Sequence, residues 1–167
     1  TPFRSVIIPG ILAGLDRVGW EEVAERLNSN KKIGATDQCK SILELSYVHL
    51  PEHLKPCLIY FGAFSEDQEI SIQRLMWLWI AEGFVQKNES ESPEKIAEGY
   101  IMALINRSLV MEGQQRSIGG VKTCFIHELL HVFCLEKAKE HNFLQLIPGY
   151  DGFLKNNTSQ HLRRLFV

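Results

Sequence analysis

Apolar residues recur along most of this 167-residue chain with the period of an α-helix. The clearest stretch lies between residues 71 and 83, where apolar side chains return every three or four positions and so share one helical face. Its members are Ile72, Leu75, Met76, Trp79 and Ile80. Ser71 is expected to cap this helix at its N-terminus, and Gly83 to end it. Trp77 lies off the apolar face, and an exposed tryptophan there indicates an interface.

Two segments before this helix carry the same periodicity. Residues 39–46 present one apolar face, and the helix is expected to stop before Pro51 because proline disfavours the helical conformation in the residue that precedes it. Residues 54–61 present another, with Gly62 expected as a C-terminal cap. Residues 65–69 are polar and are expected to form a loop.

Two segments after it are also predicted to be helical. Ser92 and Pro93 provide a cap and a first-turn proline, which predicts a helix over residues 93–107. Another helix is expected over residues 129–143.

Short β-like runs occupy residues 109–111 and 121–126, and the loop between them contains the glycines that a hairpin needs. The resulting order of helix, helix, helix, hairpin and helix is that of a winged helix-turn-helix. We therefore expect a mainly α fold, in which the remnant of a helical bundle is followed by a winged-helix domain with a small β-hairpin.

Composition narrows the functional classes. The 18 basic and 20 acidic residues leave a net charge of −2, which disfavours a nucleic-acid partner. Apolar runs fall short of the roughly 20 residues that span a bilayer. Four cysteines at irregular spacing are expected to be buried, reduced thiols of a cytoplasmic protein.

The run His127-Glu128-Leu129-Leu130-His131 offers a metal-site hypothesis, because H-E-x-x-H on a helix is the signature of zinc peptidases. Such a site needs both histidines on one helical turn and a third ligand downstream. Here β-like residues lead directly into His127, so the two histidines are not expected to share a turn. Cys134 and Lys137 stand where the extended motif wants a glycine and a histidine. Histidines satisfied by hydrogen bonds are the favoured alternative.

A winged helix also raises the possibility of DNA binding, in which the second helix of the motif enters the major groove. The corresponding segment, residues 93–107, carries Glu94, Lys95, Glu98 and Arg107 and is nearly neutral. Recognition of a phosphate backbone requires an excess of basic residues, so we expect no nucleic-acid partner.

Three longer stretches then follow one another in a recognisable order. They are Leu45-Ser46-Tyr47 with Leu50-Pro51, residues 57–67, and Leu78-Trp79-Ile80-Ala81-Glu82-Gly83-Phe84. Together they resemble motifs in the NB-ARC region of plant NLR immune receptors, especially coiled-coil receptors of the late-blight-resistance type. Two shorter stretches are similar to further motifs of that family. Ile126-His127-Glu128 resembles the methionine-histidine-aspartate motif, and Thr1-Pro2-Phe3 resembles the end of the GLPL motif.

The resemblance implies three parts. Residues 1–49 would be the end of the helical ARC1 subdomain, residues 50–148 the ARC2 winged-helix subdomain, and residues 149–167 a linker and the start of a leucine-rich repeat region. Glu128 replaces the aspartate of the family motif, and its extra methylene would make it a poorer helix cap.

The resemblance also implies a function. Such receptors are ADP/ATP switches that control defence and cell death, and the family's roles place His127 near the β-phosphate of ADP and Pro2 near the adenine. Other NB-ARC subdomains, the leucine-rich repeats and a self-oligomer would be the partners. This sequence lacks the G-x-x-x-x-G-K-[ST] phosphate loop and a strand ending in an Mg²⁺-binding aspartate. We therefore expect a regulatory part that is not an enzyme and binds no nucleotide tightly alone.

Overall fold

The computed structural model describes residues 10, 19, 21–25, 34–65 and 68–141, with the backbone of residues 145–146 and 165–166. The helices are α3 (Ala35–Val48), α4 (Lys55–Ile59), the 3-10 helix η2 (Tyr60–Ala63), α5 (Ile72–Ala81), α6 (Pro93–Asn106) and α7 (Glu128–Glu140). The strands are β1 (Ile70–Ser71), β2 (Met111–Glu112), β3 (Thr123–Phe125), β4 (Gln145–Leu146) and β5 (Leu165–Phe166). Pro2 and most of residues 149–167 lie outside the described residues.

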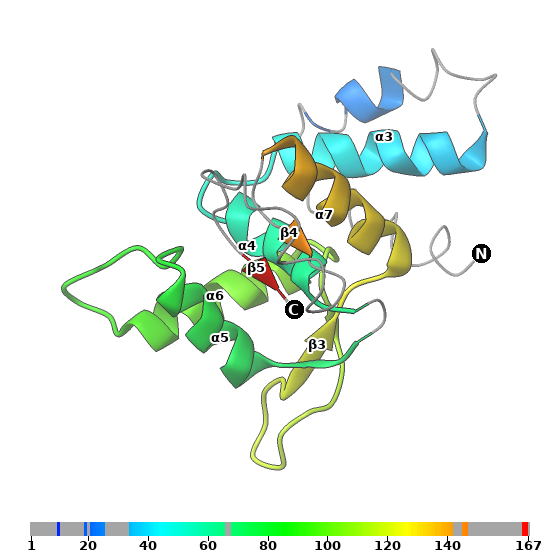
Figure 1. Ribbon diagram of the computed structural model, residues 1–167. Helices are drawn as coiled ribbons and strands as arrows, with labels where there is room; N and C mark the ends of the chain where they lie inside the picture. The colour runs from blue at the N-terminus through cyan, green and yellow to red at the C-terminus, as the bar shows by residue number, and fades with distance from the viewer. Residues whose placement is uncertain are drawn as a thin grey trace, which may run out of the picture.

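The first three strands form an antiparallel sheet in the order β1-β3-β2. Cys124 of β3 lies opposite both Ile70 of β1 and Glu112 of β2. Chain order and sheet order are together those of a winged helix, in which α5 and α6 are the helix pair and the β2–β3 hairpin is the wing (Figure 1). The prediction of a mainly α chain with a winged-helix domain is confirmed.

Strand β1 was not predicted, because residues 65–69 look like a loop that leads straight to the Ser71 cap. Two residues are too few to show the alternation that marks a strand, and the pairing exists because β3 offers an open edge. The pairing continues into α5, where the Ile72 N–H donates to Lys122 O at 3.0 Å.

Local signals placed the ends of the helix pair correctly. Ser71 and Ser92 cap α5 and α6, accepting the amides of Arg74 and Lys95. Gly83 has a φ of +76° and ends α5. Its N–H donates to Ile80 O, and the next amide, of Phe84, donates to Trp79 O. This is the Schellman arrangement, which favours glycine because φ is positive.

Gly62 has a different role from the predicted C-terminal cap. It lies inside η2, with Phe64 as the C-cap, and it faces α7. A Cβ at Gly62 would lie 3.4 Å from Leu135 Cδ2 and 3.5 Å from the carbonyl carbon of Cys134. A methyl group would just touch α7, so a larger side chain would force the helix away from η2.

Helix α7 begins at Glu128 and ends at Glu140, three residues before the predicted end. Lys137 and Lys139 lie in its last turn, where basic side chains complement the exposed carbonyls. In Figure 1, α7 and α3 lie together at one end of the molecule and the wing projects at the other.

The core lies between the helices and the sheet. Trp79 is fully buried and meets the Phe61 ring edge-on with the ring centroids 6.2 Å apart, whereas 52% of Trp77 is exposed. The indole N–H of Trp79 has no hydrogen-bond partner among the described residues, so this side chain stabilises the fold through packing alone. The apolar stripe predicted from sequence is the buried face of α5. None of the helices formed by the described residues is long and apolar enough to cross a membrane.

Replacing Trp79 by alanine is expected to lower the free energy of unfolding by about 3–5 kcal/mol, because it empties a large aromatic site in the core. Trp77→Ala should cost about 0.5 kcal/mol or less, as is usual for exposed positions. Urea unfolding followed by circular dichroism measures both values. Equal losses for the two variants would contradict the assignment of the buried face.

Candidate functional site

His127 stands at the junction between β3 and α7. Its backbone is extended, with φ −70° and ψ 148°, and it forms the N-cap of α7. The Nδ1 atom accepts the backbone N–H of Leu129 at 3.2 Å. Nδ1 is separated from the backbone by the same number of bonds as the Oδ1 of asparagine, a preferred N-cap acceptor. The imidazole therefore caps the helix as an asparagine would.

This cap determines the tautomer of the His127 ring. An Nδ1 atom that accepts a hydrogen bond carries no proton, so the proton of the neutral ring is on Nε2. The half-buried ring thus presents an N–H donor beside the N-terminus of α7, where the helix dipole favours anions. Protonation of Nδ1 would abolish the cap.

Glu128 is not the cap, contrary to the expectation drawn from the family motif. It occupies the first helical position, one residue after the cap, as the acidic residue of the first turn. A carboxylate there interacts favourably with the helix dipole whichever acid supplies it. The replacement of aspartate by glutamate therefore leaves the capping hydrogen bond intact.

His131 lies one turn after His127 and is buried, with 9% of its surface exposed. Its backbone N–H donates to His127 O at 2.9 Å, which closes the first turn of α7. His127 itself keeps the extended backbone of an N-cap, so the two histidines do not both lie inside the helix, as expected from the β-like residues before His127. Its Nε2 lies 2.7 Å from the backbone oxygen of Phe64. A carbonyl oxygen can only accept, so Nε2 carries a proton and cannot coordinate a metal.

The zinc hypothesis gains no support from the surrounding side chains. Within the described part of the chain, no three His, Cys, Asp or Glu residues are grouped closely enough to hold a metal ion. The four cysteines are buried free thiols. Burial raises the pKa of Cys57 and of Cys124 to about 12 and also raises that of Cys134, which keeps these thiols protonated and unreactive at neutral pH.

The DNA-binding hypothesis also lacks a basic surface on the second helix of the pair. Lys95 at the start of α6 pairs with Glu91 at 3.0 Å, and Arg107 at its end donates to Ala103 O. Glu98 is exposed on the same helix. The surface that would enter a major groove is therefore close to neutral, as the sequence predicted.

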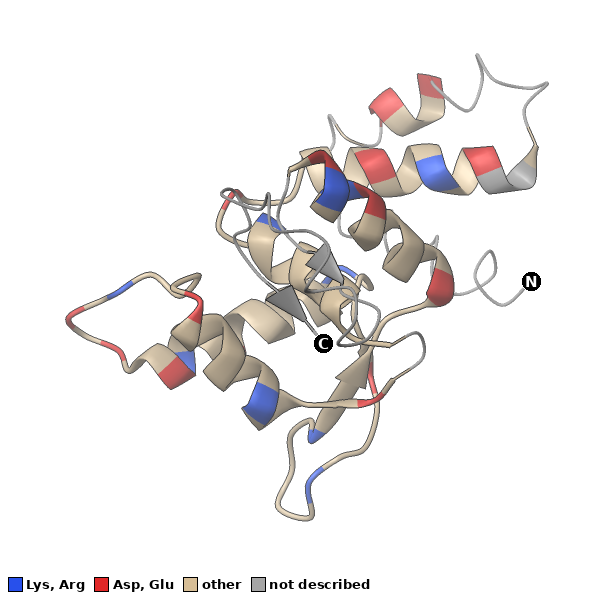
Figure 2. Cartoon of the chain, viewed as in Figure 1, with Lys and Arg blue, Asp and Glu red and all other residues tan. Residues whose placement is uncertain are grey.

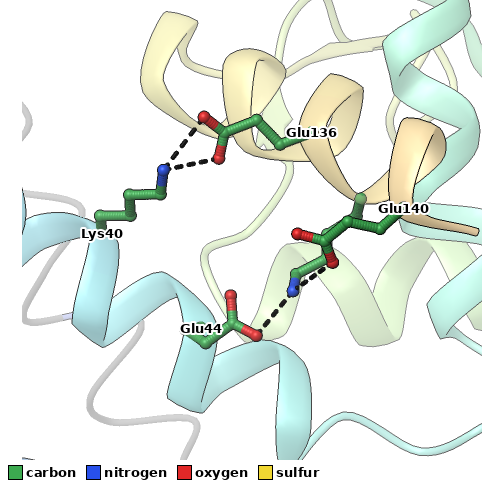
Figure 3. Close-up of polar contacts among 5 residues, drawn as sticks. Lys40, Glu44, Glu136 and Glu140 are labelled. Atoms are coloured by element: carbon green, nitrogen blue, oxygen red, sulfur yellow. Dashed lines mark hydrogen bonds and ion pairs between the residues drawn. The ribbon is translucent and has the colours of Figure 1, made fainter.

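The other end of α7 is joined to α3 by ion pairs (Figure 3). Lys40 of α3 pairs with Glu136 of α7 at 2.8 Å. In the opposite direction, Lys137 of α7 pairs with Glu44 of α3 at 2.7 Å and with Glu140 of its own helix at 2.9 Å. Helix α7 therefore connects the winged helix to the helix that precedes it.

Lys137 is the best enclosed of these charges, with 12% of its side chain exposed. Burial by itself lowers the pKa of Lys137, but hydrogen bonds to Glu44 and Glu140 outweigh this and raise it. The ammonium group also lies 5.7 Å from the centroid of the Tyr47 ring and 5.6 Å from that of Phe133. The Lys137 hydrogen bond in turn lowers the pKa of Glu140. That stabilising contribution is present above the ordinary pKa of the carboxyl group and is lost as the pH falls through the lowered value.

Of the two residues predicted to contact nucleotide, the structure places only His127, because Pro2 lies outside the described residues. The sequence carries no signal that His131 and Lys137 connect α7 to other elements. Their partners lie 67 and 93 positions away, at Phe64 and Glu44, and no local pattern encodes such distances.

Comparisons with known proteins agree with this architecture. The model of the disease resistance protein winged-helix domain matches residues 63–134, from the end of η2 into α7. Two late blight resistance protein homologs of Solanum demissum are 45% and 44% identical to this chain over 146 residues, which is 86% of it. The chain spans about a tenth of the length of these curated relatives.

We expect the purified chain to retain no stoichiometric zinc after incubation with the metal and dialysis. The reason is the proton on His131 Nε2 and the absence of a third ligand among the described residues. Atomic absorption measures the metal content. One equivalent of zinc that disappears in a His131→Ala variant would overturn this interpretation.

A double-mutant cycle of Lys137→Met and Glu44→Gln should give a coupling free energy of about 0.5–1 kcal/mol, the upper part of the range for ion pairs near the surface. The matched cycle of Lys40→Met and Glu136→Gln should give a smaller value, since 58% and 43% of those side chains are exposed. Urea unfolding of the four members of each cycle provides the comparison. A larger coupling for the exposed pair would show that enclosure does not determine the strength of this junction.

Proposed function

Because this chain belongs to the disease resistance protein family and contains its winged-helix domain, we propose that it is the regulatory part of an ADP/ATP-dependent plant immune switch. The observation that carries this proposal is the position of His127. It couples a ring N–H donor to the start of α7, the helix that joins the winged helix to α3. A regulatory residue of this kind needs no catalytic group of its own.

In the proposed mechanism, His127 interacts through Nε2–H with the diphosphate of ADP held by a phosphate loop elsewhere in the receptor. The Nδ1 cap supports this role because it leaves Nε2 as the protonated nitrogen. Bound ADP would thereby favour one orientation of α7, and exchange for ATP would remove that preference. A ligand shifts such an equilibrium only through a difference in its affinity for the two states.

Helix α7 is suited to transmit the change. His131 and Cys134 attach it to the segment α4–η2 through the oxygens of Phe64 and Leu58, and Lys137 attaches it to α3. Movement at the His127 end would therefore alter the packing of α3 against the winged helix. Such a bistable junction can convert a local contact into a domain rearrangement.

The remaining parts of the proposal concern the whole receptor. Its nucleotide site, with Pro2 against the adenine, would be completed by other NB-ARC subdomains, and this chain alone would bind ADP weakly. The parallel pairing of β4 with β5, in which Gln145 lies opposite Leu165, has the spacing of a leucine-rich repeat and supports such a region at the C-terminal end. The proposed setting is the cytoplasm, and activation would involve self-association and lead to cell death.

In a receptor that contains both this chain and a phosphate loop, His127→Ala should weaken ADP binding by about ten- to a hundredfold, the value of a hydrogen bond to a charged acceptor. It should also cause effector-independent cell death. Isothermal titration with ADP and leaf expression assays measure the two effects. The same change in the 167-residue chain should have no effect on nucleotide binding, because binding by that chain is itself expected to be weak.

Two matched variants separate the phosphate contact from the cap. His127→Asn keeps an acceptor at the Nδ1 position but loses the Nε2 donor, whereas His127→Gln keeps a donor near Nε2 and loses the cap. The sensor role predicts that asparagine behaves like alanine in ADP titrations and that glutamine behaves more like the native receptor. The opposite ranking would show that His127 acts only by stabilising α7.

A further inference from the structure

A groove of about 620 Å³ lies between α5 and the wing loop (residues 113–122). Its lining includes Met76 and Trp77 of α5, Glu94 of α6, and Arg116 and Lys122 of the wing loop. The elements that line it, α5 and the wing, lie at the end of the molecule away from the junction of α7 with α3 (Figure 1). The function proposed above makes no use of this surface.

Two large apolar side chains are exposed at or near the groove. Trp77 is 52% exposed on α5, and Ile118, next to the lining residue Ser117, is 96% exposed. The wing loop that carries Ile118 is a hydrogen-bonded turn, in which the Gly119 N–H donates to Arg116 O and the Arg116 N–H to Gly120 O. Exposed tryptophan in a groove is a common anchor of protein interfaces, because covering it removes much apolar surface from water.

The charges of the groove have one prevailing sign. Arg116 and Lys122 form no ion pair with any described residue, and Glu94 is the only acidic residue of the lining. Arg74 is exposed one turn before Trp77 on the same helix. Figure 2 shows basic positions on the first turn of α5 and on the wing, whereas α3 and α7 carry both acidic and basic positions. The groove is thus locally positive in a chain of net charge −2.

We propose that this groove binds an acidic segment of a partner polypeptide. That segment places one large apolar side chain against Trp77 and its carboxylates against Arg116 and Lys122. Apolar lining and unpaired cations in one hollow are complementary to such a segment. A nucleic acid fits less well. A second hollow of about 220 Å³ beside the wing is lined by Glu98 and Glu112, which would repel a phosphate backbone that crossed from the wing to α6.

The test measures fluorescence anisotropy of three labelled probes added to the 167-residue chain. The first probe is a synthetic peptide with one phenylalanine among aspartates and glutamates. The second is the same peptide with lysines in place of the acids, and the third is a mixed-sequence DNA duplex. We expect saturable binding of the acidic peptide that weakens as salt is added, and little binding of the other two.

Matched variants locate the binding. Trp77→Ala and Arg116→Glu should each weaken binding of the acidic peptide by about tenfold or more. Val132→Ala and Lys139→Glu remove comparable exposed apolar and basic groups from α7 and should leave binding unchanged, with circular dichroism confirming that all four variants are folded. Absent peptide binding, tighter binding of the duplex, or equal losses in the α7 variants would each overturn the proposal.

Discussion

The attachment of α7 to the α4–η2 segment is the contact on which the arrangement of this chain depends. Gly62 lets the helix pack directly against the backbone of η2, and the buried His131 ring donates to Phe64 O across that contact. The Cys134 thiol adds a third link by donating to Leu58 O at 3.3 Å. A buried polar group must find a partner, so His131 defines the position of α7 more sharply than apolar packing alone would.

With that contact made, α7 connects features that are far apart in the sequence. Its first residues follow β3 and its cap is His127, while its last turn reaches α3 through the enclosed ammonium group of Lys137. A helix of 13 residues spans about 20 Å, and its internal hydrogen bonds make it a stiff connection. Within the described residues, α7 thus links the winged helix to α3, and the helix pair does not carry the basic surface that DNA recognition demands.

Much of this structure follows from the sequence because the responsible interactions are local. The apolar stripe of α5 placed Trp79 inside and Trp77 outside, and both positions are as predicted. Ser92 with Pro93 marks the start of α6, and Gly83 marks the end of α5, because caps and positive φ angles involve only neighbouring residues. The resemblance of three motif stretches to one family was sufficient for the family and the fold class.

Tertiary structure alone decided what depends on partners distant in the chain. Strand β1 exists because β3 is beside it, and two residues carry no periodicity of their own. His127 is the cap of α7 because the extended backbone ends there. The family motif had suggested Glu128 as the cap, which lies one residue later in the first turn of the helix. His131 and Phe64 are 67 positions apart, and their hydrogen bond forms only after the helices have packed. Sequence periodicity specifies which faces are buried, whereas the identity of the groups that meet across those faces follows from topology.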